Sequence, residues 1–450
     1  MDNIFRAYDI RGIYGTDLDD HIAVKIGKAY CAYMGKGCNI AIGRDVRVSS
    51  NTLSDAVISG IRASGCNVID IGTVPSPVLY YSVRHLKLDG GVMVTASHLP
   101  PEWNGFKFCD AEGITLSEQK GIQDIKNFFL KDRFFTVEQG QYMRNNEIRQ
   151  HYVTEILNKV QVSKMHKVVF DYGNSVTAVI MPEIIKKLGI QAYEINKEYG
   201  TKVSGRVSEL TDESLKTLSE TVLNLNADLG IAYDGDGDRV AFVDENGKIY
   251  SSGNILIPVF AEYILKKHKK GRIVIDITCS SAVSDYIKHL GGETIVTRVG
   301  HSFVANEVLK NKALMGGQYS GHMCFADWDC LDDAIYSSLK MLEILTATEM
   351  KLSELISKIP VYPTTKMKDL PCPDNLKFSV IKKVTDIARH KKYEVVTIDG
   401  VKIVTETGWV LIRASNTAPI IRVNAEGKSI EQAIMLQSLG EKLVEEVMNQ

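Results

Sequence analysis

Short apolar runs alternate with amphipathic segments along most of the chain, and one such unit recurs three times. In the first unit, an apolar run at Ile40–Ile42 precedes a segment with apolar residues at helical spacing. That segment ends at Gly65, before a second run at Val68–Ile71. Residues 167–196 and 272–299 repeat this order. Helical spacing closed by glycine, between β-branched runs, is typical of βαβ units. Because the three units are unequally spaced, we expect three related α/β domains rather than a solenoid.

The C-terminal part follows a different pattern. A helix-like stretch at Leu376–Ala388 comes first, and an amphipathic segment at Ile430–Val447 ends the chain. The strand-like runs between them are Glu394–Ile398, Val401–Thr405, Trp409–Arg413 and Pro419–Asn424. This order predicts an α+β domain with an antiparallel sheet. The predicted fold class is therefore α/β, with three related mixed-sheet domains and a C-terminal α+β domain. The predicted domains cover residues 1–150, 151–250, 251–365 and 366–450.

Composition and charge narrow the possible partners. The 450 residues fit two to four domains of roughly 100–200 residues each. With 53 basic and 55 acidic residues the net charge is -2, so a global basic field for nucleic acid is absent. No apolar run approaches the roughly 18–20 residues of a membrane span. The N-terminal residues carry charges and no apolar secretory region, so we expect a cytoplasmic protein.

The eight cysteines are scattered along the chain without any Cys-x-x-Cys pair. Zinc knuckles and a disulfide framework are therefore not expected, and we expect free thiols in a reducing compartment.

A first polar cluster, Thr95-Ala96-Ser97-His98, follows an apolar run at Gly91–Val94. A serine placed where a buried strand gives way to a loop can act as a nucleophile. An isolated serine in such a place is more often a helix cap or a turn residue. Asn104-Gly105-Phe106-Lys107 then supplies a tight turn and a nearby cation.

The second cluster, Asp234-Gly235-Asp236-Gly237-Asp238-Arg239, lies between two strand-like runs. Three carboxylates at alternate positions repel one another, and a bound divalent cation removes that cost. Hard carboxylate oxygens favour Mg²⁺ or Ca²⁺ over zinc. A calcium EF-hand is rejected because Arg239 stands where its loop requires glycine. The alternative is a solvated acidic hairpin.

The third cluster is Gly317-Gln318-Tyr319-Ser320-Gly321-His322. In an extended strand, the alternating side chains Gln318, Ser320 and His322 would share one face and could bind sugar hydroxyls. The fourth cluster is Arg413-Ala414-Ser415-Asn416-Thr417, with Arg422 further on. An arginine fork beside hydroxyl, amide and turn N–H donors favours a phosphate site. Taken alone, the third stretch is more simply an ordinary polar loop, and the fourth could also be a polar turn between two strands.

These clusters, in this order, resemble the α-D-phosphohexomutase family, and most of all its phosphomannomutase/phosphoglucomutase branch. The resemblance extends over essentially the whole chain, from Phe5–Gly12 to Arg413–Thr417. It implies three α/β domains and a mobile fourth domain around a central cleft. It also implies a reversible phosphoryl shift between the 1- and 6-positions of a mannose or glucose phosphate. Mg²⁺ and a hexose 1,6-bisphosphate activator would be the cofactors.

The resemblance also implies roles for individual residues. Ser97 would carry the phosphoryl group, and Asp234, Asp236 and Asp238 would bind Mg²⁺ together with an oxygen of phospho-Ser97. Lys107 is a candidate for proton transfer. The other catalytic positions are Arg11, His98 and Arg239. The sugar-binding positions are Tyr8, His301, Gln318, Ser320 and His322. The positions for the phosphate that does not react are Arg413, Ser415, Asn416, Thr417 and Arg422.

Two residues depart from the family pattern. Gln318 stands where the family usually has Glu, and Leu99 stands where it usually has Asn. A phosphoglucosamine mutase is the nearest alternative, although that branch usually has Ala at the position of Gly237 and Ile at that of Phe106. A non-catalytic phosphosugar-binding protein is the alternative from another class. The oligomeric state is left open.

Overall fold

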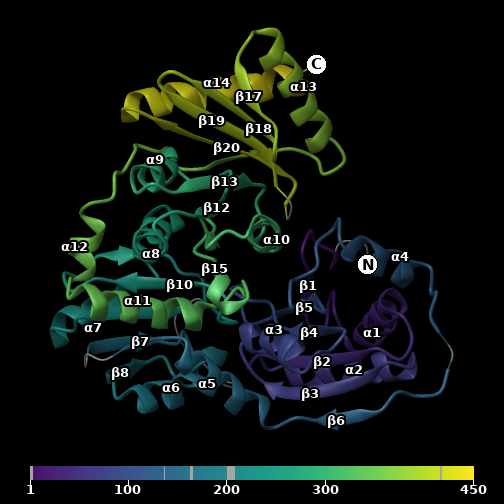
Figure 1. Cartoon of the computed structure of the whole chain (residues 1–450). Helices are drawn as coiled ribbons and strands as arrows, with labels where there is room; N and C mark the ends of the chain where they lie inside the picture. Colours follow the sequence, from purple (N-terminus) through teal and green to yellow (C-terminus); the bar gives the residue numbers. More distant parts are fainter. Residues whose placement is uncertain (1–3, 136, 163–165, 200–207, 416–417, 450) are drawn as a thin grey trace.

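A computed structural model of the chain describes residues 4–135, 137–162, 166–199, 208–415 and 418–449. Four sheets follow one another along the chain, and Figure 1 shows them from the purple N-terminal domain to the yellow C-terminal one. The predicted α/β class, with mixed sheets in three domains and an antiparallel sheet in the fourth, is confirmed.

The first domain is built on a six-stranded sheet in the order β1-β5-β4-β2-β3-β6. Its strands are β1 (Ile10–Ile13), β2 (Asn39–Arg44), β3 (Asn67–Thr73), β4 (Gly90–Val94), β5 (Trp103–Asp110) and β6 (Tyr142–Arg144). Its helices are α1 (Asp20–Met34), α2 (Ser50–Ala63), α3 (Ser76–His85) and α4 (Ile122–Leu130). Ile40 and Ile42 pack in the core formed by α1, α2 and α4, whereas Ala41 between them packs in the core that includes α3. Both faces of β2 are therefore buried around Ile40–Ile42, which explains why these three residues form an unbroken apolar run.

The second and third domains repeat part of this architecture. The second contains β7 (Lys167–Asp171), β8 (Gln191–Ile195), β9 (Leu229–Tyr233), β10 (Val240–Val243) and β11 (Ile249–Tyr250), with α5 (Ile148–Asn158), η2 (Val176–Val179), α6 (Met181–Leu188) and α7 (Lys216–Leu225). The third contains β12 (Arg272–Asp276), β13 (Glu293–Thr297), β14 (Met315–Gly317) and β15 (Met323–Phe325). Its helices are α8 (Gly253–His268), α9 (Ser281–His289), α10 (His301–Asn311), η3 (Ala326–Trp328), α11 (Ala334–Thr348) and α12 (Leu352–Ile356).

One four-strand pattern is common to the first three sheets. The strand orders β5-β4-β2-β3, β10-β9-β7-β8 and β15-β14-β12-β13 are equivalent. In each, three neighbouring strands are parallel and the remaining strand joins them antiparallel. The three βαβ units found in the sequence are therefore three copies of one topology.

The fourth domain has a five-stranded antiparallel sheet in the order β16-β20-β19-β18-β17. Its elements are β16 (Lys368–Pro371), α13 (Lys377–His390), β17 (Glu394–Val396), β18 (Val401–Thr405), β19 (Gly408–Ala414), β20 (Ile420–Gly427) and α14 (Ile430–Met448). Val410 and Ile412 pack in a core with residues of both helices. Trp409 and Leu411, on the opposite face of β19, pack against Ile277 of the third domain. One face of β19 thus packs against α13 and α14, and the other face packs against the third domain.

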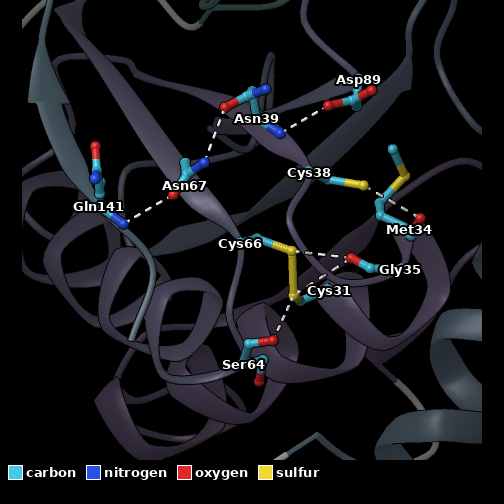
Figure 2. Close-up of a disulfide and its surroundings, with 10 residues drawn as sticks. All are labelled: Cys31, Met34, Gly35, Cys38, Asn39, Ser64, Cys66, Asn67, Asp89 and Gln141. Carbon is cyan, nitrogen blue, oxygen red and sulfur yellow. Dashed lines mark hydrogen bonds between the residues drawn. A yellow bond between two sulfur atoms is a disulfide. The ribbon is translucent and has the colours of Figure 1, made fainter. Parts of the chain in front are cut away.

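The cysteine prediction is wrong for one pair. Cys31, in α1, and Cys66, just before β3, form a disulfide bond, and Figure 2 shows it beside the carbonyl of Gly35. The end of α1 and the loop after α2 meet because these two helices pack side by side. No Cys-x-x-Cys spacing marks such a pair. The cysteines that the structure describes as free are Cys38, Cys109, Cys279, Cys324, Cys330 and Cys372.

Within the described residues, no helix is both long enough and apolar enough to cross a membrane.

Candidate active site

Each of the three related domains contributes the same loop to one pocket. This is the loop that leads from the third parallel strand of the shared pattern into its antiparallel neighbour. It carries Ser97 between β4 and β5, Asp234–Arg239 between β9 and β10, and Gln318–His322 between β14 and β15. The pocket has a volume of about 220 Å³. It is lined by Tyr8, Asp9, Arg11, Ser97, His98, Lys107, Asp238, Arg239, Val299, Gly300, His301, Gln318, Ser320 and His322.

Ser97 faces the acidic loop of the second domain. Its Oγ donates to Asp234 Oδ2 at 3.0 Å and lies 3.3 Å from His98 Nδ1. Its backbone has φ = 51°, in the left-handed region that side-chain-bearing residues rarely adopt. A Cβ on Gly235 would lie 2.1 Å from the carbonyl oxygen of Ser97, so only glycine allows this approach.

The three carboxylates of Asp234, Asp236 and Asp238 are buried and lie within 4.8 Å of one another. Lys107 Nζ donates to Asp236 Oδ2 and Asp238 Oδ2, each at 2.6 Å. Arg239 Nε donates to Asp234 Oδ2 at 3.2 Å. The negative charge of the loop is thus compensated from two directions, as buried carboxylates require.

The same carboxylates fit a hard divalent cation. Among the described residues, Asp236 Oδ1 and Asp238 Oδ1 are buried and have no hydrogen-bond partner. Buried acceptors without partners are costly, and a bound cation would satisfy them. An all-oxygen donor set favours Mg²⁺ or Ca²⁺.

Burial and charge shift the pKa of several of these groups. Burial opposes the charge on Lys107, but the carboxylates of Asp236 and Asp238 outweigh it and raise the pKa of the ammonium well above its usual value. Burial opposes the charge on Asp238 as well, yet Lys107 and His322 lower its pKa. For Asp234, burial and the neighbouring Asp238 raise the pKa to about 7.

The three histidines of the pocket differ in charge. Burial, helped by Arg239 and Arg11, lowers the pKa of His98 to about 2. Burial and the neighbouring His322 lower the pKa of His301 to about 3. Burial also opposes the charge on His322, but Asp332, 2.7 Å away, and Asp238 outweigh it and raise its pKa. His301, His322 and Asp332 could also group around a metal, but a raised pKa of His322 favours its protonated form, which cannot bind one.

The N-terminal residues reach across the pocket to the third domain. The hydroxyl of Tyr8 donates to Val299 O at 2.6 Å. Arg11 Nε donates to Asp9 Oδ2 at 2.7 Å.

Two nitrogen atoms of described pocket residues lack a hydrogen-bond partner. Among the described residues, Arg239 Nη2 and His301 Nε2 are buried without a partner. Both are therefore available to a bound anion or sugar.

Gln318, Ser320 and His322 line one pocket. They stand in a polar turn rather than an extended strand, since Gln318 N donates to His322 O and Gly321 has φ = 91°. Gln318 Nε2 lies 3.4 Å from Asp276 Oδ2, so the amide faces a buried carboxylate.

The fourth cluster lies outside this pocket, in the fourth domain. Arg413 and Arg422 are paired across β19 and β20. Each also meets a carboxylate, because Arg413 Nη2 is 3.1 Å from Asp399 Oδ2 and Arg422 Nε is 3.4 Å from Asp369 Oδ1. Ser415 is buried and its carbonyl accepts from Lys377 Nζ at 2.6 Å. Asn416 and Thr417 lie outside the described residues.

Several residues of the site carry no signal in the sequence. Asp9 and Val299 line the pocket, Asp276 meets Gln318, and Asp332 holds His322. Asp399 pairs with Arg413. Asp9 stands in the Phe5–Gly12 stretch of the resemblance, whereas the other four lie outside every polar motif, so only their spatial neighbours reveal them.

Comparison with known protein families agrees with the four-domain organisation of the structure. Four domain families match the chain in order: phosphoglucomutase/phosphomannomutase alpha/beta/alpha domain I over residues 2–135, domain II over 150–247, domain III over 252–362 and the C-terminal domain over 370–437.

Relatives and solved structures match the whole chain. A probable phosphoglucosamine mutase of Pyrococcus abyssi is 36% identical over 454 residues, covering 100% of this chain and 99% of the relative. A phosphoglucomutase/phosphomannomutase of Thermococcus kodakarensis is 35% identical, with 100% of both chains covered. The crystal structure of a phosphoglucomutase/phosphomannomutase family protein from Burkholderia thailandensis superimposes with a TM-score of 0.90 at 29% identity, covering 100% of this chain and 98% of that one. The chain therefore belongs to the α-D-phosphohexomutase family.

Proposed function

We propose that the protein interconverts the 1- and 6-phosphates of mannose or glucose, with Ser97 as the phosphoryl carrier. The observation that carries this proposal is Ser97 Oγ, 3.0 Å from an acidic loop that fits a divalent cation, in a pocket lined by cationic side chains. Phosphoryl transfer depends chiefly on positioning and on neutralising charge. A pocket that offers both is suited to it.

Different residues of the pocket would bind the metal, supply positive charge and carry the phosphoryl group. Mg²⁺, held by Asp234, Asp236 and Asp238 with an oxygen of phospho-Ser97, would neutralise charge on the transferring group. Arg11, Lys107 and Arg239 supply further positive charge from the protein. In the transfer, the P–O bond to Ser97 Oγ breaks and a P–O bond to a sugar hydroxyl oxygen forms. The proton of that hydroxyl ends on Ser97 Oγ, and the sugar becomes a bisphosphate. After this intermediate turns around, its other phosphate returns to Ser97.

Two further roles complete the cycle. We assign proton transfer to Lys107, whose ammonium lines the pocket that contains Ser97. It would donate a proton to the leaving Ser97 oxygen and recover one from the attacking sugar hydroxyl. Arg413, Ser415 and Arg422 would bind the phosphate at the far end of the sugar. A site that grips a phosphate rather than a particular carbon accepts both orientations of the bisphosphate. Closure of the fourth domain would exclude water from the phosphoserine.

The assignment of Ser97 is tested directly. The purified protein should carry one phosphate on Ser97 by intact-mass analysis and peptide sequencing. With Mg²⁺ and a hexose 1,6-bisphosphate, it should convert mannose 1-phosphate or glucose 1-phosphate to the 6-phosphate. Ser97→Ala should abolish both the phosphate and the turnover. Turnover that survives in Ser97→Ala would show that another group carries the phosphate. A protein without phosphate or turnover would instead be a non-catalytic phosphosugar-binding protein.

The metal is tested by removal. Treatment with EDTA should abolish turnover, and added Mg²⁺ should restore it. An enzyme that keeps its full rate after complete metal removal would contradict the assignment of the three aspartates.

A phosphoglucosamine mutase is the second candidate, because several relatives of similar identity have that name. The test is a comparison of kcat/KM for glucosamine 1-phosphate, mannose 1-phosphate and glucose 1-phosphate. A clear preference for the amino sugar would favour this second function.

A further inference from the structure

Four backbone carbonyls of the loop that carries Ser97 converge on a single guanidinium. Arg47 Nη2 donates to Ser97 O at 2.8 Å and to Leu99 O at 2.7 Å. Arg47 Nη1 donates to Pro100 O at 2.7 Å and to Trp103 O at 3.1 Å. One side chain therefore fixes the loop from Ser97 to the start of β5.

The remaining donor of Arg47 anchors it to the scaffold of the first domain. Nε donates to Asp45 Oδ2 at 3.1 Å, and the side chains of Arg47 and Asp45 are only 10% and 2% exposed. A guanidinium has five N–H donors in a rigid plane, and here all five are used. Lysine has no comparable fork, so the two residues are not equivalent at this position.

Asp45 is itself held from several sides. Its Oδ1 accepts from the backbone N–H of Arg47 and from the hydroxyl of Ser50, at the start of α2. Ser50 also accepts from Asn104 Nδ2 at 3.0 Å, on β5. The anchor of Arg47 thus connects the end of β2, the first turn of α2 and the strand that follows the Ser97 loop.

The carbonyl of Ser97 has a second close neighbour across the domain boundary. It lies against Gly235, where an added Cβ would approach to 2.1 Å. Arg47 and Gly235 together fix the direction of this carbonyl, and the Ser97 backbone is held at φ = 51°. A fixed backbone places the Cα and Cβ of Ser97, and from that position Oγ donates to Asp234 Oδ2 at 3.0 Å.

We propose that Arg47 is a positioning residue of the mutase reaction, which aims Ser97 Oγ by binding the carbonyls of its loop. This inference rests on the proposed role of Ser97 as phosphoryl carrier. It also explains how the chain accommodates leucine at position 99. Arg47 binds the backbone carbonyl of Leu99, and this contact does not depend on the side chain. Among the described residues, Arg47 is not part of the pocket lining, and its guanidinium donates to Asp45 and to the carbonyls of Ser97, Leu99, Pro100 and Trp103.

The test compares Arg47→Lys with Arg44→Lys. Arg44 is a matched control on β2, because it is 14% exposed and its partners are Asn51 and Asp70 rather than the Ser97 loop. A misplacement of about 1 Å in a reacting group can lower a rate about 100-fold. We expect Arg47→Lys to lower kcat about 100-fold with KM changed less than threefold, while Arg44→Lys stays within threefold of wild type in both.

A second readout does not depend on activity. Hydrogen–deuterium exchange should become at least tenfold faster in peptides covering residues 95–107 of Arg47→Lys and stay unchanged in Arg44→Lys. If wild type shows no turnover, the proposed function fails, yet the exchange experiment still tests the positioning role. Unchanged exchange in this loop, or a kcat within threefold of the control, would overturn the proposal.

A milder variant keeps the proposal testable if Arg47→Lys does not fold. Asp45→Asn preserves the shape of the anchor and removes its charge. A decrease in kcat of about tenfold at unchanged KM would support the positioning role, and an unchanged kcat in a folded Asp45→Asn protein would overturn it.

Discussion

Gln318 differs from its family counterpart by one amide nitrogen, and the structure gives that nitrogen a partner. Its Nε2 lies 3.4 Å from Asp276 Oδ2. Asp276 also accepts from the backbone N–H groups of Thr278 and Tyr319, and burial raises its pKa. A carboxylate at position 318 would meet another buried carboxylate at this distance. Glutamine and glutamate have the same shape, but only the amide of glutamine can donate to Asp276 and so fits beside it.

Gln318→Glu should therefore lower kcat/KM about tenfold, equivalent to about 1.4 kcal/mol of lost transition-state stabilisation. Like charges in a buried site repel and displace the side chain from the sugar. The double variant Gln318→Glu/Asp276→Asn removes one of the two charges and should recover to within threefold of wild type. Steady-state kinetics on the preferred sugar phosphate measures both values. A single variant as active as wild type would show that Asp276 does not determine the residue at 318.

At the scale of elements, the loop between β9 and β10 depends on close approach to the loop between β4 and β5. A Cβ on Gly235 would collide with the backbone of Ser97. A backbone carbonyl held by Arg47 cannot move aside easily. The two loops therefore fit each other only if residue 235 lacks a side chain.

Gly235→Ala is expected to lower kcat at least 100-fold, because the acidic loop and Ser97 must separate to admit the methyl group. Gly189→Ala is the matched control in the same domain. Gly189 ends α6 at φ = 67° with open space around its Cβ position, so the change costs about 1 kcal/mol of backbone strain. Thermal unfolding and kcat should separate the two variants. Equal activities would show that the loops adapt to each other.

At the scale of the whole molecule, the fourth domain docks on the third through a small apolar contact framed by polar bonds. Trp409 Nε1 donates to Ser281 Oγ at 3.0 Å. Val299 N donates to Asp399 Oδ2 at 3.2 Å, and Lys402 Nζ donates to Ile277 O at 3.3 Å. Such a limited interface suits a domain that opens and closes.

Asp399→Ala should raise KM for the sugar phosphate about tenfold with little change in Ser97 phosphorylation. Asp399 both orients Arg413 and ties the fourth domain to Val299, so its loss should misplace Arg413 and with it the proposed site of the distal phosphate. Asp369→Ala is the control, since its partner Arg422 is 34% exposed and surface ion pairs contribute about 0–1 kcal/mol. An equal rise in KM for both variants would contradict a special role for Asp399.

Lys402, whose ammonium donates to Ile277 O between the third and fourth domains, is expected to make the stability of the folded chain depend on pH. Burial lowers its pKa to about 8, from a usual value of 10.5. Below pH 8 the ammonium is charged in both the folded and the unfolded chain, and its burial costs stability. Between pH 8 and 10.5 the unfolded chain binds more protons than the folded one, so this cost diminishes as pH rises.

In Lys402→Met the cost is absent at every pH. The melting temperature of Lys402→Met minus that of wild type should therefore fall as pH rises from 8 to 10.5. Thermal unfolding followed by circular dichroism at several pH values gives this difference. A difference that does not change with pH would show that Lys402 titrates at its usual value.

Much of the fold could be predicted from local patterns. Val401–Thr405 is a strand with the predicted bounds, and the predicted helix at Ile430–Val447 is α14. Apolar residues recur with the period of the element because the core lies on one side of it, so each segment carries its own signal. The short edge strand β16 (Lys368–Pro371) was not expected, since most of its residues are exposed and no apolar alternation marks it.

The candidate site was predicted only in part. Ser97 and the three aspartates stand in dense polar motifs between apolar runs, which a sequence displays. Arg47 gave no such signal, because its partners are backbone carbonyls and any residue has one. The disulfide between Cys31 and Cys66 and the pair Arg413–Asp399 depend on how separate segments pack.

The sequence by itself determined the three repeated βαβ units, the distinct C-terminal domain and the residue types of each polar cluster. Those features follow from local periodicity and from side-chain type. Only the tertiary structure decided that equivalent loops of three domains meet in one pocket, that Lys107 bridges Asp236 and Asp238, and that Arg47 holds the loop of Ser97. These contacts join residues distant in the chain, and their geometry is set by the packing of whole domains rather than by any local pattern.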